Sequence, residues 1–177
     1  MQVILQAAEQ VLRRDPAASM EQIAAAAGVA RTTVHRRFVN RDALIEALRQ
    51  WVTSEFARAF DAARPQTAPP LIALYQVTAN LLQVKVDWGF ALSRMQASTS
   101  TSGDDSEVHQ RCRALFRRAL DESVLRPGID TDWAARVFLS LLHASVYEGQ
   151  QGGDTDALAT RIVDTLLQGL GSKGISG

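Results

Sequence analysis

Cysteine and lysine are almost absent from this chain of 177 residues, and its formal net charge is zero. The single cysteine, Cys112, excludes a disulfide within the chain and is typical of a protein in a reducing cytoplasm. Zero net charge excludes nucleic-acid binding through overall charge alone. No apolar run approaches the roughly 18 residues of a membrane-spanning helix, so we expect a cytoplasmic protein with no membrane segment.

Strand signals are also scarce, which indicates an all-α protein. Alanine, leucine, glutamine and arginine are abundant, and all four are good helix formers. Apolar residues recur at helical spacing between breaks at Pro16, Gly28, Pro65 and Pro127. The expected helices cover residues 2–14, 20–27, 30–38, 41–64, 71–88, 90–97, 107–123, 131–145 and 155–170.

The segment 19–41 is the most informative about function. Ser19 and Gln22 have the spacing of a capping box, and Gly28 can adopt the positive φ that ends the helix they start. In the next helix Val34 and Phe38 lie four residues apart and share the inward face. Two short helices joined at a glycine, the second rich in arginine and threonine, are typical of a helix-turn-helix that places its second helix in the major groove of DNA.

The local charge of this segment differs from that of the whole chain. Residues 31–41 contain four arginines and no acid. Salt screens charges beyond about 10 Å, so DNA phosphates respond to this patch and not to the net charge. The alternative is a basic face that is merely solvated. The predicted contacts to double-stranded DNA are Ser19, Arg31, Thr32, Thr33, His35, Arg36, Arg37 and Arg41.

The same segment carries a family resemblance. The run Ser19–Val29, followed by Thr33-Val34, Arg36, Phe38, Asn40-Arg41 and Ala43-Leu44, resembles the N-terminal domain of TetR-type transcriptional regulators. Upstream, Ile4-Leu5 and Ala7-Ala8 are similar to that family's first helix. Three residues depart from the family pattern: Ala30 stands where a capping serine is usual, Thr32 where a small residue is common, and His35 where tyrosine is frequent.

The resemblance implies an all-helical fold of about nine helices. It implies a helix-turn-helix DNA-binding domain over residues 1–48 and a ligand-binding and dimerisation domain over residues 49–177. It further implies a homodimeric repressor that binds an inverted-repeat operator and is released by a small molecule. No enzymatic activity and no cofactor are expected.

The last two expected helices carry apolar seams with no later helix to cover them. This favours a subunit interface, and the alternative is a core within one chain. The predicted interface residues are Phe138, Leu142, Leu158, Ile162 and Leu166.

Aromatic and polar side chains of the middle helices are candidates for the effector site, although the same residues could form plain core. The leading candidates are Trp88, Arg94 and His109, followed by Phe56, Phe60, Tyr75, Met95, Cys112 and Phe116. His109 and Cys112 lie three residues apart on one helix, so a metal-binding helical protein is an alternative, but no further ligand pair accompanies them. A regulator that acts through a protein partner is a second alternative.

Overall fold

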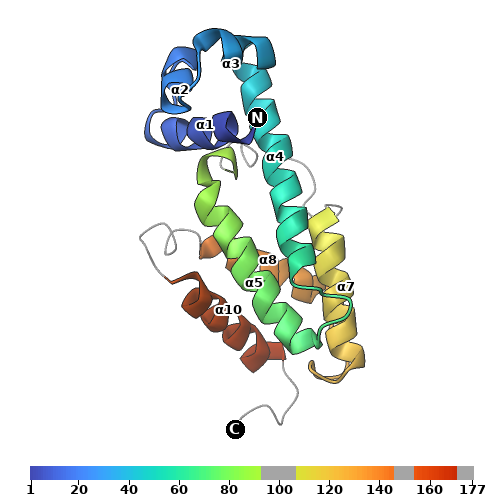
Figure 1. Cartoon of the computed structure of the whole chain (residues 1–177). Helices are drawn as coiled ribbons and strands as arrows, with labels where there is room; N and C mark the ends of the chain where they lie inside the picture. Colours follow the sequence, from blue (N-terminus) through green and yellow to red (C-terminus); the bar gives the residue numbers. More distant parts are fainter. Residues whose placement is uncertain (93–106, 146–153, 171–177) are drawn as a thin grey trace. The chain divides into compact units, whose positions relative to one another are not determined.

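The computed structural model describes residues 1–92, 107–145 and 154–170, and these residues form an all-α structure, as predicted (Figure 1). The helices are α1 (Gln2–Arg14), α2 (Met20–Ala26), α3 (Arg31–Arg37), α4 (Arg41–Ala62), α5 (Pro70–Asp87), α7 (Glu107–Asp121), α8 (Thr131–Ala144) and α10 (Thr155–Leu170). Their ends lie within one helical turn of the expected ones. Residues 89–92 are also helical, and the rest of the helix expected over 90–97 lies outside the described residues. None of the helices described is long and apolar enough to cross a membrane.

The contacts divide the chain into two compact units. The N-terminal unit consists of Met1–Glu55 and, among the described residues, 87–92, and the C-terminal unit contains Phe56–Val86 with α7, α8 and α10. The DNA-binding domain predicted over residues 1–48 lies inside the N-terminal unit. Its functional boundary stays a prediction.

In the N-terminal unit, α1 packs against α2, and α2 packs against α3 (Figure 1). Ile23, Val34 and Leu44 are completely buried, and Phe38 is nearly so. The burial of Val34 and Phe38 confirms the inward face predicted from their four-residue spacing. Helix α3 is therefore held by its apolar side.

The helix ends around the turn follow the predicted local signals. The Ser19 amide donates to Oε1 of Gln22 at 2.6 Å, and the Gln22 amide donates to Oγ of Ser19 at 3.2 Å, which completes the capping box. Gly28 has a φ of +65°, the region that favours glycine. Ala30 precedes α3 without a side-chain cap, so α3 lacks a hydrogen bond worth about 1 kcal/mol.

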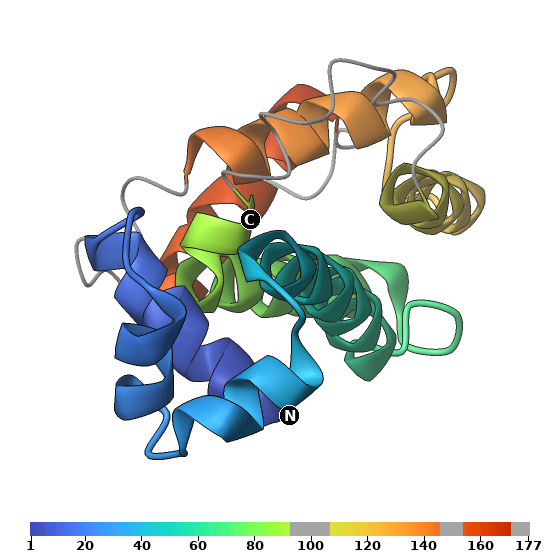
Figure 2. The same ribbon diagram turned by 90° about the horizontal axis from the view of Figure 1, so that it is seen from above.

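The core of the C-terminal unit lies among α5, α7, α8 and α10. Phe116 of α7 and Phe138 of α8 are fully buried and meet edge to face, with ring centroids 5.6 Å apart. Helices α8 and α10 pack together and lie side by side (Figure 2). Burial of these apolar faces stabilises the unit.

Two arginines of α7 hold the chain near the turn from α4 to α5. Arg118 donates to the backbone carbonyls of Pro65 and Ala68, the second at 2.9 Å. The guanidinium of Arg111 lies over the ring of Phe60, 4.6 Å from its centroid, a cation–π geometry. These contacts join α7 to the end of α4 and to the turn that follows it, so they fix where α7 lies within its unit.

Candidate functional site

The outward side of α3 displays most of the predicted DNA contacts. The helix is seven residues long, and its apolar side is buried. Its exposed side chains are Arg31, Thr32, His35, Arg36 and Arg37, and Thr33 is half-buried. Such a concentration of hydrogen-bond donors can contact both phosphates and base edges.

On this surface, Arg31 lies between an acid and a histidine. Its Nη2 is 2.8 Å from Oε1 of Glu21 on α2, and its Nε donates to Nε2 of His35 at 3.4 Å. The pKa of Glu21 is lowered by a hydrogen bond from its own backbone and by one from Ser19, with a smaller contribution from the charge of Arg31. Glu21 is therefore ionised at neutral pH and counters the charge of Arg31.

Glu21 was not among the residues expected at this surface. The available sequence signal was an acid in the first turn of the helix that precedes the exposed basic helix. That position has an ordinary explanation, since acids favour helix N-termini. Pairing with Arg31 becomes visible only when α2 and α3 are placed in space.

Arg41 and Asn40 organise the start of α4. The guanidinium of Arg41 donates through Nη1 to the carbonyl of Ala18 and through Nη2 to that of Pro16. Asn40 accepts a hydrogen bond from the Ala43 amide at 2.8 Å and thereby caps α4. We therefore expect Arg41 to position the loop between α1 and α2 instead of contacting DNA directly. The contact predicted for Ser19, which is exposed, stays a prediction.

A buried carboxylate joins α1 to the residues that follow α5. Glu9 is 2% exposed, and its carboxylate accepts hydrogen bonds from the amides of Phe90 at 2.7 Å and Ala91 at 2.9 Å. Arg13 pairs with the same carboxylate at 3.1 Å and also donates to the Asp87 carbonyl at 2.7 Å. Glu9 thus caps the helical turn that begins at residue 89, an interaction that local sequence patterns did not predict.

Trp88, a leading candidate for the effector site, lies in the N-terminal unit. It is buried and packs against Trp51, with ring centroids 6.5 Å apart and planes tilted by 50°. Trp88 also borders an open notch of about 380 Å³, which it lines together with Gln6, Glu9, Gln10 and Asp87.

Five other residues predicted for the effector site come together in the C-terminal unit. Phe60, Cys112 and Phe116 are buried in its core, and Phe56 and Tyr75 are partly buried against it. The structure therefore brings these five side chains of α4, α5 and α7 together. The positions of Arg94 and Met95 lie outside the described residues.

Two polar groups of this region are strongly perturbed. The Tyr75 hydroxyl donates to Oδ1 of Asp164 at 2.5 Å, and this hydrogen bond, together with burial, raises the pKa of Tyr75 to about 12. Burial raises the pKa of the Cys112 thiol to about 12 as well. Cys112 is therefore a protonated core residue at neutral pH and not a reactive thiolate.

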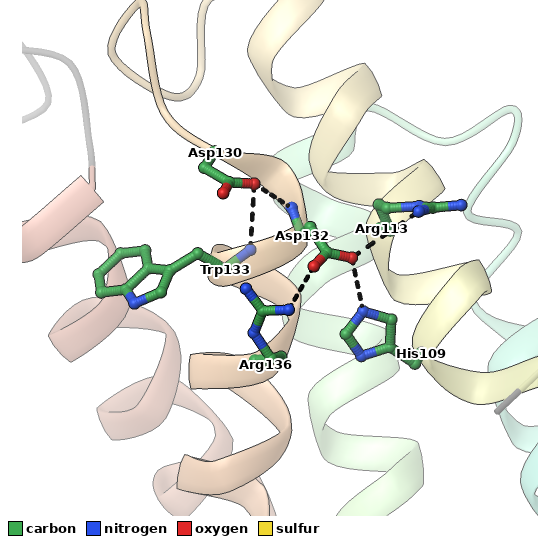
Figure 3. A network of polar contacts seen from close by, with 6 residues as sticks. All are labelled: His109, Arg113, Asp130, Asp132, Trp133 and Arg136. Atoms are coloured by element: carbon green, nitrogen blue, oxygen red, sulfur yellow. Dashed lines mark hydrogen bonds and ion pairs between the residues drawn. The ribbon is translucent and has the colours of Figure 1, made fainter. Parts of the chain in front are cut away.

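His109 belongs to a polar network between α7 and α8 (Figure 3). It is 1% exposed, and its Nε2 lies 2.9 Å from Oδ1 of Asp132. Asp132 also pairs with Arg136 and, at 3.7 Å, with Arg113. These contacts lower the pKa of Asp132, with the hydrogen bond to His109 as the main cause. Within the described ranges, no three His, Cys, Asp or Glu side chains gather to hold a metal ion.

The five residues predicted for the dimer interface are buried inside the single chain. Their exposed fractions are 0% for Phe138 and Leu142, 6% for Leu158, 4% for Ile162 and 3% for Leu166. They pack in the core of the C-terminal unit, so they have almost no surface left for a second subunit. Their part in a subunit interface stays a prediction.

The geometry defines a class of protein. Two short helices meet at a glycine with positive φ, and the second is held by Val34 while its arginines are exposed. This is the arrangement of a helix-turn-helix DNA-binding regulator.

The comparisons with known proteins give the family. Residues 4–48 match the sequence profile of the bacterial regulatory proteins of the tetR family. Over 174 residues the chain is 31% identical to the HTH-type transcriptional repressor LfrR of Mycolicibacterium smegmatis. The aligned region covers 94% of this chain and 88% of LfrR. The chain belongs to the TetR family, as its motif predicted.

Solved structures share the fold. The TetR-like regulator LfrR from Mycobacterium smegmatis, in complex with proflavine, matches with a TM-score of 0.69 at 29% identity, covering 97% of this chain and 96% of LfrR. SmeT, the repressor of the Stenotrophomonas maltophilia multidrug efflux pump SmeDEF, also matches with a TM-score of 0.69. Its identity is 22%, with 99% of this chain and 92% of SmeT covered. The likeness to SmeT concerns the fold alone.

Proposed function

We propose that this protein is a homodimeric transcriptional repressor that binds an inverted-repeat operator and is released from it by a small molecule. The observation that carries the proposal is the exposed basic side of α3 within a helix-turn-helix whose other side is buried. The relative LfrR is named a repressor and is similar along 94% of this chain. A protein of this kind acts on chromosomal DNA, which supports a cytoplasmic location.

Arg36 and Arg37 are the residues to which we assign the main DNA contacts. Both are exposed in the last turn of α3, and arginine forms bidentate contacts to phosphate and to guanine. Thr32 and Thr33 supply hydroxyl and methyl groups for phosphate or thymine. Because α3 has only seven residues, we expect two copies to act together on half-sites about 34–36 Å apart, or a multiple of that spacing.

We infer that the second subunit binds the outer side of α8. Trp133 is 48% exposed, and Val137 and Leu141 follow it at four-residue intervals and are only partly buried. Tryptophan is a common anchor at the centre of protein interfaces. These residues take the place of Phe138 and Leu142 in the predicted interface, because the latter already belong to the core.

The effector that we propose is a small aromatic molecule bound in the C-terminal unit. The partly buried rings of Phe56 and Tyr75 lie at the edge of the aromatic core and are accessible without unfolding it. LfrR was crystallised with proflavine, a fused-ring aromatic compound. Effector release requires that the molecule bind the DNA-free conformation more tightly than the DNA-bound one.

Selection of duplexes from a random-sequence library tests the proposal. The purified protein should enrich an inverted repeat, and a saturating amount of proflavine should lower its affinity for the selected duplex. Enrichment of an asymmetric site would contradict the two-fold arrangement. Failure to bind any duplex would favour a regulator that acts through a protein partner. Unchanged affinity at saturating proflavine would remove proflavine as an effector.

A further inference from the structure

We propose that Glu21 is a specificity-determining residue that orients Arg31 and restrains it from pairing with any nearby DNA phosphate. The inference rests on the proposed DNA-binding function of α3. It adds an acid to a surface where only basic and hydroxyl side chains were expected.

The guanidinium of Arg31 contacts two neighbouring side chains, those of Glu21 and His35. Nη2 of Arg31 lies 2.8 Å from Oε1 of Glu21, and Nε donates to His35 at 3.4 Å. The Glu21–Arg31 pair joins α2 to the first residue of α3 across the glycine turn. The guanidinium is therefore directed from two sides before DNA arrives.

The pair is weak enough for DNA to compete with it. The Arg31 and Glu21 side chains are 65% and 46% exposed, and exposed ion pairs contribute little to stability. In a non-specific complex, affinity comes from the phosphates that basic side chains neutralise. While Arg31 stays paired with Glu21 it neutralises the carboxylate instead, so the complex loses about one phosphate contact.

An operator complex depends on the orientation of Arg31 as well as on its charge. A guanidinium held in place loses less conformational freedom when it binds a defined base or phosphate. Removal of Glu21 should therefore strengthen binding to every duplex through charge, but weaken the preference for the operator through lost orientation. The two effects have opposite signs: the affinity for any duplex rises, whereas the preference for the operator falls.

The expected magnitude follows from counterion release. One additional phosphate contact per subunit changes the slope of log K against log salt by about −0.9 per subunit. If the two lines meet near 1 M salt, the Glu21→Gln variant should bind a random-sequence duplex about eight-fold more tightly at 0.1 M for each subunit in contact with the DNA. The operator affinity should rise by less, so that the ratio of operator to random-duplex affinity falls.

Fluorescence anisotropy over about 50–200 mM salt tests this with a random-sequence duplex and the selected operator. Glu46→Gln is the matched control, because Glu46 is an exposed acid of the N-terminal unit that pairs with Arg49 at 2.6 Å. It removes the same charge from an acid that pairs with Arg49, whereas Glu21 pairs with Arg31. Thermal unfolding of each variant checks that α2 remains folded, since Glu21 also lies in the first turn of that helix.

A double-mutant cycle with Arg31→Gln completes the design. The steeper slope of Glu21→Gln should vanish in the Arg31→Gln background, because the effect acts through Arg31. Persistence of the effect in that background would overturn the inference, as would a salt slope equal to that of Glu46→Gln or an unchanged affinity ratio. A wild-type protein that binds neither duplex would refute the proposed DNA-binding function itself, whereas the other results would refute only the role of Glu21.

Discussion

Glu9 offers a sharp test of how the N-terminal unit is held together. The carboxylate is almost completely buried and accepts from the amides of Phe90 and Ala91 while pairing with Arg13. The substitution Glu9→Gln keeps the size of the side chain and removes its charge. The carboxamide oxygen can accept from one amide, but the carboxamide NH₂ then faces the other amide, and a buried donor loses its acceptor.

The magnitude follows from these contacts. A hydrogen bond to a charged group contributes about 1.5–3 kcal/mol, and a buried donor without an acceptor costs about 1–3 kcal/mol. Allowing for relaxation, we expect Glu9→Gln to lower the free energy of unfolding by about 3 kcal/mol. For a chain of 177 residues this corresponds to a decrease in Tm of about 6–12 °C.

Thermal and urea unfolding followed by circular dichroism measure this change. Glu46→Gln is again the control, because its carboxylate pairs with Arg49 at the surface and the loss of an exposed ion pair should change the free energy of unfolding little. If Glu9→Gln is as stable as Glu46→Gln, the Glu9 carboxylate does not hold the residues after α5 to α1.

Three further predictions follow from how far single side chains are buried or exposed. Desolvation lowers the pKa of Lys85 from 10.5 to about 8, so the unfolded chain keeps this proton to higher pH than the folded one. The free energy of unfolding of the wild type should therefore rise between pH 8 and 10, and Lys85→Met should abolish the rise. Because burial raises the pKa of Cys112 to about 12, a thiol reagent at pH 8 should label it only after denaturation, and rapid labelling of the native protein would contradict its position in the core. Trp133→Glu should give a monomer of unchanged helicity in sedimentation experiments, and an intact dimer would exclude the outer side of α8 as the interface.

The sequence predicted the helices and the DNA-binding motif because their signals are local. The capping box of Ser19, the positive φ of Gly28 and the four-residue spacing of Val34 and Phe38 each act within one or two turns of chain. Such features keep their meaning whatever the rest of the protein does.

The contacts of Glu9 and Glu21 could not be predicted in the same way. Glu9 caps a helical turn about eighty residues away in the chain, and an isolated acid on α1 gives no sign of that partner. Glu21 has a sufficient local reason for its position at a helix N-terminus, so its pairing with Arg31 depends on how α2 and α3 cross.

The predicted dimer residues show a different limit. Apolar periodicity identifies the side of a helix that is hidden from water, but a protein core and a subunit interface require the same pattern. On α8, Phe138 is completely buried while Trp133 is 48% exposed, although both are large apolar residues of one helix. Only the packing within the chain separates them.

The central claim is that α3 brings this protein onto DNA through Arg36 and Arg37. Its most direct test is the salt dependence of binding to the selected inverted-repeat duplex, for wild type and for the double variant Arg36→Ala, Arg37→Ala. Loss of two phosphate contacts per subunit should flatten the slope of log K against log salt by about 1.8 per subunit and weaken binding at low salt. A double variant with the affinity and salt slope of the wild type would contradict the account.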